Sequence, residues 1–206
     1  MRVRATAALA ALLLTALTAC GGSDDKADSK SPDKASVDSG ASSSAAEQPS
    51  KDTPFGKPAQ TTGSGGTGVV EITPTNIVYT VKGGGETSQY GTFVVVTTKD
   101  KAVTAVAADE EPPAGGGGWE WIAPDGQSID EGGGNAYNVV MDQYNNAGNI
   151  EPGSFQLRAK VFDLTAAQAE GGTLVYKDGT GVAHRWTAPA KGAGPDVAAV
   201  KKQLEF

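Results

Sequence analysis

The sequence predicts an all-β domain, a two-sheet sandwich of about eight short strands, behind a secretion leader and a flexible tether. Three observations lead to this prediction. Apolar and β-branched runs recur from residue 67 onward, separated by Gly, Pro, Asn and Asp. An uncharged apolar run follows the basic start of the chain. Between these two regions the chain has almost no large apolar side chains, and such a segment cannot build a core.

Composition excludes several classes of function. The chain has 206 residues with one Cys and one His, which rules out an internal disulfide framework and any zinc or iron–sulfur site built from several Cys or His ligands. The formal net charge is −7 at pH 7. A chain this acidic lacks the basic surface that binds a phosphate backbone, so nucleic acid is not an expected partner.

The beginning of the chain has the features of an export signal. The basic start containing Arg2 and Arg4 precedes an apolar run, 5–16, that is too short to span a bilayer. The following Leu17-Thr18-Ala19-Cys20 resembles the bacterial lipobox, and the single Cys of the chain stands where that pattern needs it. The resemblance implies cleavage before Cys20, which makes residues 1–19 the signal peptide. An ordinary secretory signal with an incidental Cys is the alternative.

Lipidation of Cys20 would determine where the protein lies. In the lipobox family this thiol carries a diacylglyceryl group, and two acyl chains meet the requirement for stable membrane anchoring. Removing residues 1–19 deletes Arg2 and Arg4 but no acidic side chain, so the mature chain is more acidic still. We therefore expect a lipid-anchored protein on the extracytoplasmic face of the cell membrane, attached through Cys20.

Residues 20–66 are predicted to form a disordered tether. Val37 and Phe55 are its only strongly apolar side chains, and the rest is rich in Ser, Ala, Gly, Asp and Lys. The stretch 63–68 matches the G-x-G-x-x-G pattern of dinucleotide-binding loops. That motif needs a strand before it and a helix after it, and here a strand pattern follows instead. We therefore interpret 63–68 as the end of the linker.

The predicted sandwich covers residues 67–188. Its apolar run Thr92–Thr98 predicts a central strand covered on both faces, with a turn at 99–101. In the run 155–163, Phe155, Leu157, Ala159 and Val161 alternate with Gln156, Arg158 and Lys160, which predicts a buried apolar face and a solvent-exposed polar one. A hairpin is predicted at 177–180, which contains Asp-Gly. The predicted strands are 69–73, 76–82, 92–98, 102–107, 118–123, 155–163, 172–176 and 181–187.

Two segments are ambiguous. Residues 134–149 fit either a strand or a single helical turn. The tail 189–206 fits a short helix that begins near Asp196 and places Val197, Val200 and Leu204 on one face. A helix this short is marginal unless it docks on the domain.

Motifs along the sandwich region resemble a known family. In order, they are Tyr90–Val96, Trp121–Gly126, Glu151–Ser154 and Ala159–Asp163. Together they resemble a lipoprotein-borne immunoglobulin-like domain of unknown function, related in fold to the immunoprotective secreted antigen family of actinobacteria. The resemblance covers roughly residues 66–188 and implies an immunoglobulin-like sandwich of about seven or eight strands. It implies no catalytic residues.

The sequence offers little catalytic chemistry. His184 is the only imidazole, and no nucleophile or metalloprotease motif accompanies it. We therefore expect no enzyme activity and no cofactor. Acidic side chains could instead hold calcium where loops converge, although a solvated acidic face is the alternative. These calcium candidates are Asp109, Glu110, Glu111, Asp125, Asp130 and Glu131.

Aromatic side chains suggest a binding surface. Trp119, Trp121 and Tyr137 are the candidates, although large aromatics of a domain without disulfides are needed in its core. We expect Trp121 and Trp186 to be buried and Trp119 to be exposed. The sequence thus predicts an envelope lipoprotein with a non-enzymatic binding domain for a protein or wall-polymer partner. A carbohydrate- or wall-binding module using exposed aromatics is the alternative, followed by a small envelope hydrolase.

Overall fold

The computed structural model describes residues 52–111 and 117–205. The predicted signal peptide, Cys20 and most of the predicted tether lie outside the described residues. None of the helices in the described ranges is both long enough and apolar enough to cross a membrane.

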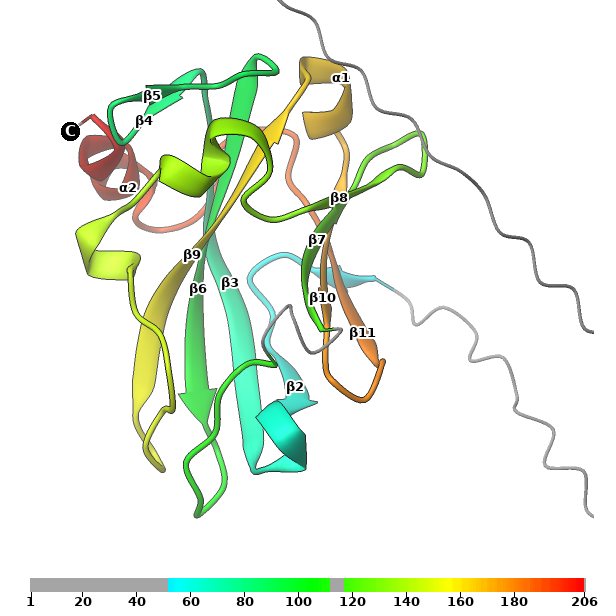
Figure 1. Cartoon of the computed structure of the whole chain (residues 1–206), viewed down its shortest axis with the longest axis vertical. Helices are drawn as coiled ribbons and strands as arrows, with labels where there is room; N and C mark the ends of the chain where they lie inside the picture. The colour runs from blue at the N-terminus through cyan, green and yellow to red at the C-terminus, as the bar shows by residue number, and fades with distance from the viewer. Residues whose placement is uncertain (1–51, 112–116, 206) are drawn as a thin grey trace, which may run out of the picture. The chain divides into compact units, whose positions relative to one another are not determined.

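Two β-sheets pack face to face, as the sequence predicts, with few and short helices (Figure 1). One sheet has the order β1-β11-β10-β7-β8, and the other has the order β2-β3-β6-β9. Within these two sheets all pairs are antiparallel except β1 with β11. The strands of the first sheet are β1 Thr53–Pro54, β7 Gly118–Ile122, β8 Ser128–Asp130, β10 Thr173–Lys177 and β11 Ala183–Thr187. Those of the second are β2 Ala59–Thr62, β3 Val69–Thr80, β6 Thr92–Ala102 and β9 Phe155–Leu164.

Short elements complete the described part of the chain. A small hairpin joins β3 to β6, and helical turns lie beside the sheets. Residues 134–149 contain two 3-10 turns, so this segment is helical in part and does not form the alternative strand. These elements are β4 Lys82–Gly83, β5 Glu86–Thr87, η1 Ser64–Gly66, η3 Gly134–Asn138, η4 Asp142–Tyr144, α1 Ala166–Ala169 and α2 Val197–Leu204.

Strand β6 lies at the centre of its sheet, which confirms the central-strand prediction, but the predicted turn at 99–101 is wrong. The strand continues to Ala102, with Asp100 opposite Ile72 of β3 and Gln156 of β9. Hydrogen bonding to both neighbours outweighs the turn propensity of the polar residues. Lys99 also lies with its ammonium group 4.3 Å from the centre of the Phe155 ring. Residues 103–107, predicted to be strand, form a loop.

Pro74 creates a bulge rather than a strand end. The two predicted strands on either side of it form one continuous β3, whose register shifts between Pro74 and Asn76. Asn76 is buried there and donates a 2.9 Å hydrogen bond to the Thr97 hydroxyl. Its side-chain oxygen accepts a 2.7 Å hydrogen bond from the backbone of Asp196, so the bulge also holds the C-terminal segment.

The folded domain begins earlier than the composition indicates, so the tether boundary at residue 66 is wrong. Strand β2 pairs with β3, and β1 pairs with β11. Phe55 packs against the core, and the Trp186 indole donates a 2.9 Å hydrogen bond to the Lys57 carbonyl. Edge strands need mainly backbone hydrogen bonds, so a segment with few apolar side chains joins the sheet. The Gly-rich stretch 63–68 forms η1 and a reversal between β2 and β3, with Gly65 at a φ of 64°.

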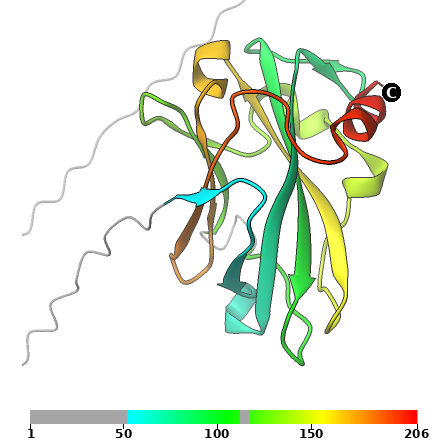
Figure 2. The ribbon, with the colours of Figure 1, turned by 180° about the vertical axis from the view of Figure 1, so that it is seen from behind.

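The C-terminal segment belongs to the domain, which therefore extends beyond residue 188. Helix α2 forms as predicted, with Val200 and Leu204 buried and Val197 partly buried against the same cluster. The Gly84 backbone donates a 3.0 Å hydrogen bond to the Leu204 carbonyl, which fixes the helix to the β4 hairpin. Figure 2 shows the chain after β11 running across to this helix.

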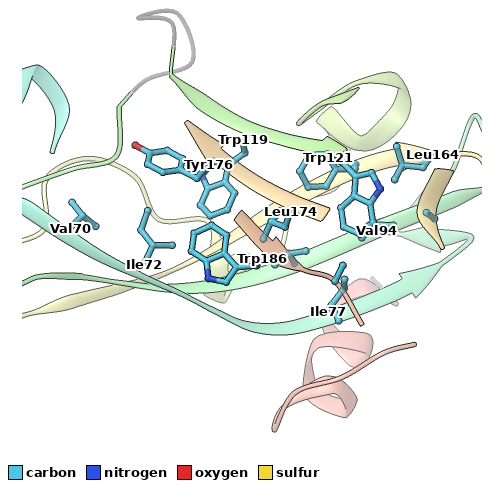
Figure 3. Close-up of a cluster of buried hydrophobic side chains, with 14 of the residues drawn as sticks. Val70, Ile72, Ile77, Val94, Trp119, Trp121, Leu164, Leu174, Tyr176 and Trp186 are labelled. Atoms are coloured by element: carbon cyan, nitrogen blue, oxygen red, sulfur yellow. The ribbon is translucent and has the colours of Figure 1, made fainter. Parts of the chain in front are cut away.

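The core between the sheets is dominated by aromatic side chains (Figure 3). Trp121, Trp186 and Tyr176 are fully buried, which confirms the prediction for both tryptophans. Trp119 is only 3% exposed, so its predicted exposure is wrong. Its ring centre lies 5.1 Å from that of Tyr176 and 5.9 Å from that of Trp186. The Gly-rich stretch before Trp119 therefore does not bring this side chain to the surface.

Candidate functional site

Strand β9 has the opposite orientation to the one predicted. Arg158 and Lys160 are buried between the two sheets, whereas Phe155 is exposed. Leu157, Ala159 and Val161 lie on the other face of the sheet, where they pack with residues of η3, η4 and α2. Alternation separates the two faces of a strand but does not say what covers each face. Here both faces are covered, and the charged face is the inner one.

The inward orientation of β9 creates a buried charge cluster, by which we mean Asp100, Asp109, Glu110, Arg158 and Lys160. Glu110 is its centre: one carboxylate oxygen accepts hydrogen bonds from the Lys160 ammonium at 2.7 Å and the Trp119 indole at 3.0 Å. Arg158 places its Nη2 atom 2.7 Å from Asp109 and its Nε atom 3.6 Å from Asp100. The strands thus bring together five charged groups that the sequence distributes over two strands and a loop.

The charges of this cluster compensate one another. Burial, reinforced by Glu110, raises the pKa of Asp100 well above its ordinary value, against the opposing effects of Lys160 and Arg158. Burial also raises the pKa of Glu110, but Lys160, Asp100 and Arg158 outweigh burial and lower it to about 2. Asp109 contacts Arg158 and Glu110 contacts Lys160, each at 2.7 Å, so each cation has a carboxylate partner. A buried ion pair needs this kind of compensation to avoid a large desolvation penalty.

A cavity of about 540 Å³ lies next to the cluster, at one edge of the sandwich. The β7–β8 region, the segment containing η3 and η4, and the edge strand β9 form its walls. Cavities of this size hold small organic molecules. The lining residues that matter most for its chemistry are Trp119, Glu131, Tyr137, Met141, Tyr144 and Val161.

Glu131 is the chemically unusual residue of the cavity. Its backbone N–H bonds to the Trp119 carbonyl at 3.1 Å, but its half-buried carboxyl group has no hydrogen bond or ion pair with any described residue. Burial raises the pKa of Glu131 to about 7, against the opposing effect of Lys160 and with a smaller contribution from Glu110. A partly desolvated carboxyl in a cavity is a candidate functional group.

Asp163 fixes the segment that covers the cavity. Its carboxylate accepts hydrogen bonds from the Ser88 hydroxyl and from the backbones of Gln89 at 2.8 Å, Tyr90 at 3.1 Å and Asn135 at 2.9 Å. Burial would raise its pKa, but these four bonds outweigh burial and lower it. The contact to Asn135 positions η3, and with it Ala136 and Tyr137 in the cavity wall.

We expect the Asp163→Asn variant to lose about 2 kcal/mol of unfolding free energy, because an amide nitrogen cannot accept the bonds from Gln89 and Asn135. The low folded pKa of Asp163 stabilises the domain above the unfolded pKa, and this stabilisation is lost as the pH falls toward the folded value. Urea denaturation at neutral and acidic pH measures both effects. An unchanged midpoint at neutral pH would contradict the role of this carboxylate, and the exposed Asp125→Asn variant is the control.

The structure does not bring the three predicted binding aromatics together on the surface. Trp121 is buried and donates a 2.8 Å hydrogen bond to the Gln168 carbonyl. Trp119 forms part of the inner wall of the cavity, whereas Tyr137 is 81% exposed beside it. Tyr144, a further aromatic that the sequence suggests for a binding surface, does line the cavity, whereas sequence reasoning missed Met141. Met141 lies in the ambiguous segment 134–149, which is apolar at intervals but has neither strand nor helix periodicity.

The six calcium candidates do not converge either. Asp109 and Glu110 are paired with Arg158 and Lys160, and Glu111 accepts a 3.1 Å hydrogen bond from the Gly65 backbone. Asp125 forms a turn through the Gln127 backbone, while Asp130 and Glu131 lie at the cavity. In the described ranges, which include all six, no three His, Cys, Asp or Glu side chains form a group that could hold a metal ion.

His184 packs on the hairpin between β10 and β11. Its Nε2 atom lies 3.7 Å from an Asp178 carboxylate oxygen, and its ring stacks on Tyr176 with centres 6.3 Å apart. Asp178 also accepts hydrogen bonds from the backbones of Thr180 and Val182, which close the predicted hairpin. The Asp178 oxygen beside His184 is Oδ2, which also accepts a 2.9 Å hydrogen bond from the Thr61 hydroxyl, whereas the two backbone bonds go to Oδ1. The contacts of this histidine are those of a packed side chain.

Comparison with known proteins assigns no family. No protein-family profile matches the chain, and no curated protein sequence matches it. Among solved structures, a conserved hypothetical protein from Bacillus anthracis is similar, with 14% sequence identity and a TM-score of 0.45. The match covers 66% of this chain and 95% of that protein. This likeness is too distant to support an argument about function.

Proposed function

We propose that the chain is a cell-envelope lipoprotein, anchored through Cys20, whose folded domain is a non-enzymatic binding module. The observation that carries the binding function is the cavity at the edge of the sandwich. It combines aromatic and apolar walls with three acidic side chains, Glu120, Asp130 and Glu131, of which Glu131 is half-buried without an ion pair among the described residues. Such a combination of apolar surface and few polar groups is typical of small-molecule and side-chain binding sites.

We further propose that the sandwich is immunoglobulin-like. Strands β3, β6 and β9 form one sheet in the manner of strands A, B and E, and β11-β10-β7-β8 follow the order G-F-C-C′. The buried Trp119 and Trp121 lie on β7, the equivalent of strand C, where immunoglobulin domains also bury a tryptophan. In such domains the packed strands keep the same arrangement, and ligands bind at the edges and loops. A cavity at an edge of the sandwich agrees with this pattern.

The environment of the acidic residues favours a binding module over a hydrolase. Glu110 has a pKa of about 2 and bonds to Lys160 and Trp119, so it is a poor proton donor or acceptor near neutral pH. Catalytic acids and bases need pKa values near the working pH. Glu131 has such a pKa, but among the described residues its carboxyl group contacts no second catalytic group.

The anchor is tested by fractionation. We expect the Cys20→Ala variant to appear in the culture medium or to accumulate as an unprocessed precursor, because only a thiol at this position accepts the diacylglyceryl group. Immunoblots of membrane and medium fractions measure this, and Ser23→Ala in the same region is the matched control. A Cys20→Ala protein that is still processed and held in the membrane fraction would contradict the anchor.

A carbohydrate- or wall-binding module is the second candidate. Tyr137 at 81% exposure and Tyr90 at 52% exposure favour it, because exposed aromatic rings stack on sugars. If this candidate is correct, sedimentation with purified cell wall is lost in Tyr137→Ala and retained in Tyr137→Phe.

A further inference from the structure

We infer that the cavity beside η3 and η4 binds a small organic cation, an ammonium group carrying apolar substituents, with Glu131 as its counter-ion. This inference rests on the proposed binding function of the cavity and names the class of ligand. Three observations carry it: the balance of charge, the aromatic lining and the unsuitability of the site for a metal ion.

Among the described residues, no cation forms an ion pair with Glu131, although Lys160 is close enough to lower its pKa. Lys160 is the nearest candidate, but its ammonium group bonds to Glu110 at 2.7 Å. Arg158 is engaged by Asp109 at 2.7 Å, and Lys177 contacts Glu120 at 3.3 Å. None of the described residues that line the cavity is Lys, Arg or His. Ionisation of Glu131 therefore adds a negative charge that Lys160, which already bonds to Glu110, offsets only in part, and a bound cation would neutralise it.

The lining provides the second part of a binding site for an organic cation. Tyr137 and Tyr144 contribute aromatic rings, and Met141 and Val161 contribute apolar surface. The Trp119 ring lies behind this wall, in the core, with the Lys160 ammonium group 5.1 Å from its centre. Ammonium groups are attracted to the faces of aromatic rings, and their alkyl substituents gain from apolar burial. A volume of about 540 Å³ is large enough for such a ligand.

A metal ion does not fit the same site. Calcium and magnesium require several converging oxygen ligands, whereas the three acidic residues of this cavity, Glu120, Asp130 and Glu131, do not form such a group. No group of three potential metal ligands occurs in the part of the chain that the structure describes. Glu120 lines the cavity too, but its carboxylate already contacts Lys177 and the Ser128 hydroxyl.

The charge of Glu131 makes the binding depend on pH. Lys160 and Glu110 are the charged groups that most affect its pKa, with Asp130 and Glu120 on the neighbouring strands. A cation binds the ionised carboxyl, so binding releases a proton when Glu131 starts protonated. The dissociation constant is therefore expected to rise about tenfold for each pH unit below 7.

The experiment uses calorimetry on the mature lipoprotein in non-ionic detergent, with tetramethylammonium chloride as the probe and tert-butanol as a neutral molecule of similar shape. At pH 8 we expect saturable binding of tetramethylammonium and much weaker binding of tert-butanol. Glu131→Gln is expected to weaken binding about tenfold or more and to abolish its dependence on pH. The exposed Glu151→Gln is the matched control and should bind like the parent protein.

The outcomes separate the inference from the proposed function. Lack of saturable binding, equal binding of tert-butanol, or parent-like binding by Glu131→Gln would each overturn the organic-cation site. Because Tyr137→Phe keeps the ring and Tyr137→Ala removes it, weaker binding in the alanine variant alone supports the aromatic contribution. Membrane retention through Cys20 and wall sedimentation are measured separately, so failure of the organic-cation site leaves the proposed function to its own tests.

Discussion

Replacing Glu110 with Ala is expected to lower the free energy of unfolding by about 3–5 kcal/mol. The reason is that Lys160 and Arg158 would remain buried without the carboxylate that Lys160 contacts at 2.7 Å. The Trp119 indole N–H, now bonded to the same oxygen at 3.0 Å, would also lose its acceptor. Urea denaturation followed by tryptophan fluorescence at neutral pH measures the loss.

A second variant separates the ion pair from local packing. Replacing Lys160 with Met together with Glu110→Ala removes both charges, so the double variant should be more stable than Glu110→Ala alone. Glu111→Ala is the matched control, because the one hydrogen bond of this neighbouring carboxylate within the described ranges comes from the exposed Gly65 backbone, and its loss is expected to cost less than about 1 kcal/mol. A loss below about 1 kcal/mol in Glu110→Ala would contradict the compensated cluster described above.

Glu131→Gln is expected to stabilise the domain above pH 7, by about 2–3 kcal/mol. The folded pKa of about 7 lies above the ordinary value of 4.5, so between these values the folded protein holds a proton that the unfolded chain has released. Stability therefore falls as the pH rises from about 4.5 to about 7 and then stays level. A glutamine at this position avoids the free-energy cost of a buried charge, because its side chain stays uncharged at every pH of the series.

The measurement is a series of urea denaturation curves between pH 4.5 and pH 8 for the parent and Glu131→Gln. The difference between the two proteins should grow with pH across this interval and level off above pH 7. Glu151→Gln, an exposed acid far from the cavity in sequence, controls for net charge and should follow the parent. Curves for the parent and Glu131→Gln that stay parallel across this interval would contradict the raised pKa of Glu131.

The two carboxyl groups illustrate different roles for buried acids. Glu110 contributes to stability because its partners compensate it, whereas Glu131 reduces stability at neutral pH because it has no partner among the described residues. Residues that cost stability are typical of sites shaped by function. This contrast supports the proposal that Glu131 belongs to a binding site, whereas Glu110 belongs to the framework.

The sequence by itself determined the class of the fold. Recurrent β-branched runs and turn residues predicted a two-sheet sandwich, the run Thr92–Thr98 predicted its central strand, and the apolar spacing of Val197, Val200 and Leu204 predicted the C-terminal helix. These predictions depend on local periodicity, which is a property of consecutive residues. The burial of Trp121 and Trp186 followed from the need of a domain without disulfides for large apolar side chains in its core.

Only the tertiary structure decided the site. The alternation along β9 identified the two faces of the strand but did not show which elements pack against each face. The burial of Arg158 and Lys160 was therefore not predictable. The pairing of Lys160 with Glu110 joins residues of a strand and a distant loop, and only the packing of the two sheets places them 2.7 Å apart. The cavity, the exposure of Tyr137 and the lack of a partner for Glu131 among the described residues likewise depend on how η3 and η4 lie against β9. Packing between segments far apart in the sequence determines where these side chains lie, and no local sequence pattern encodes that packing.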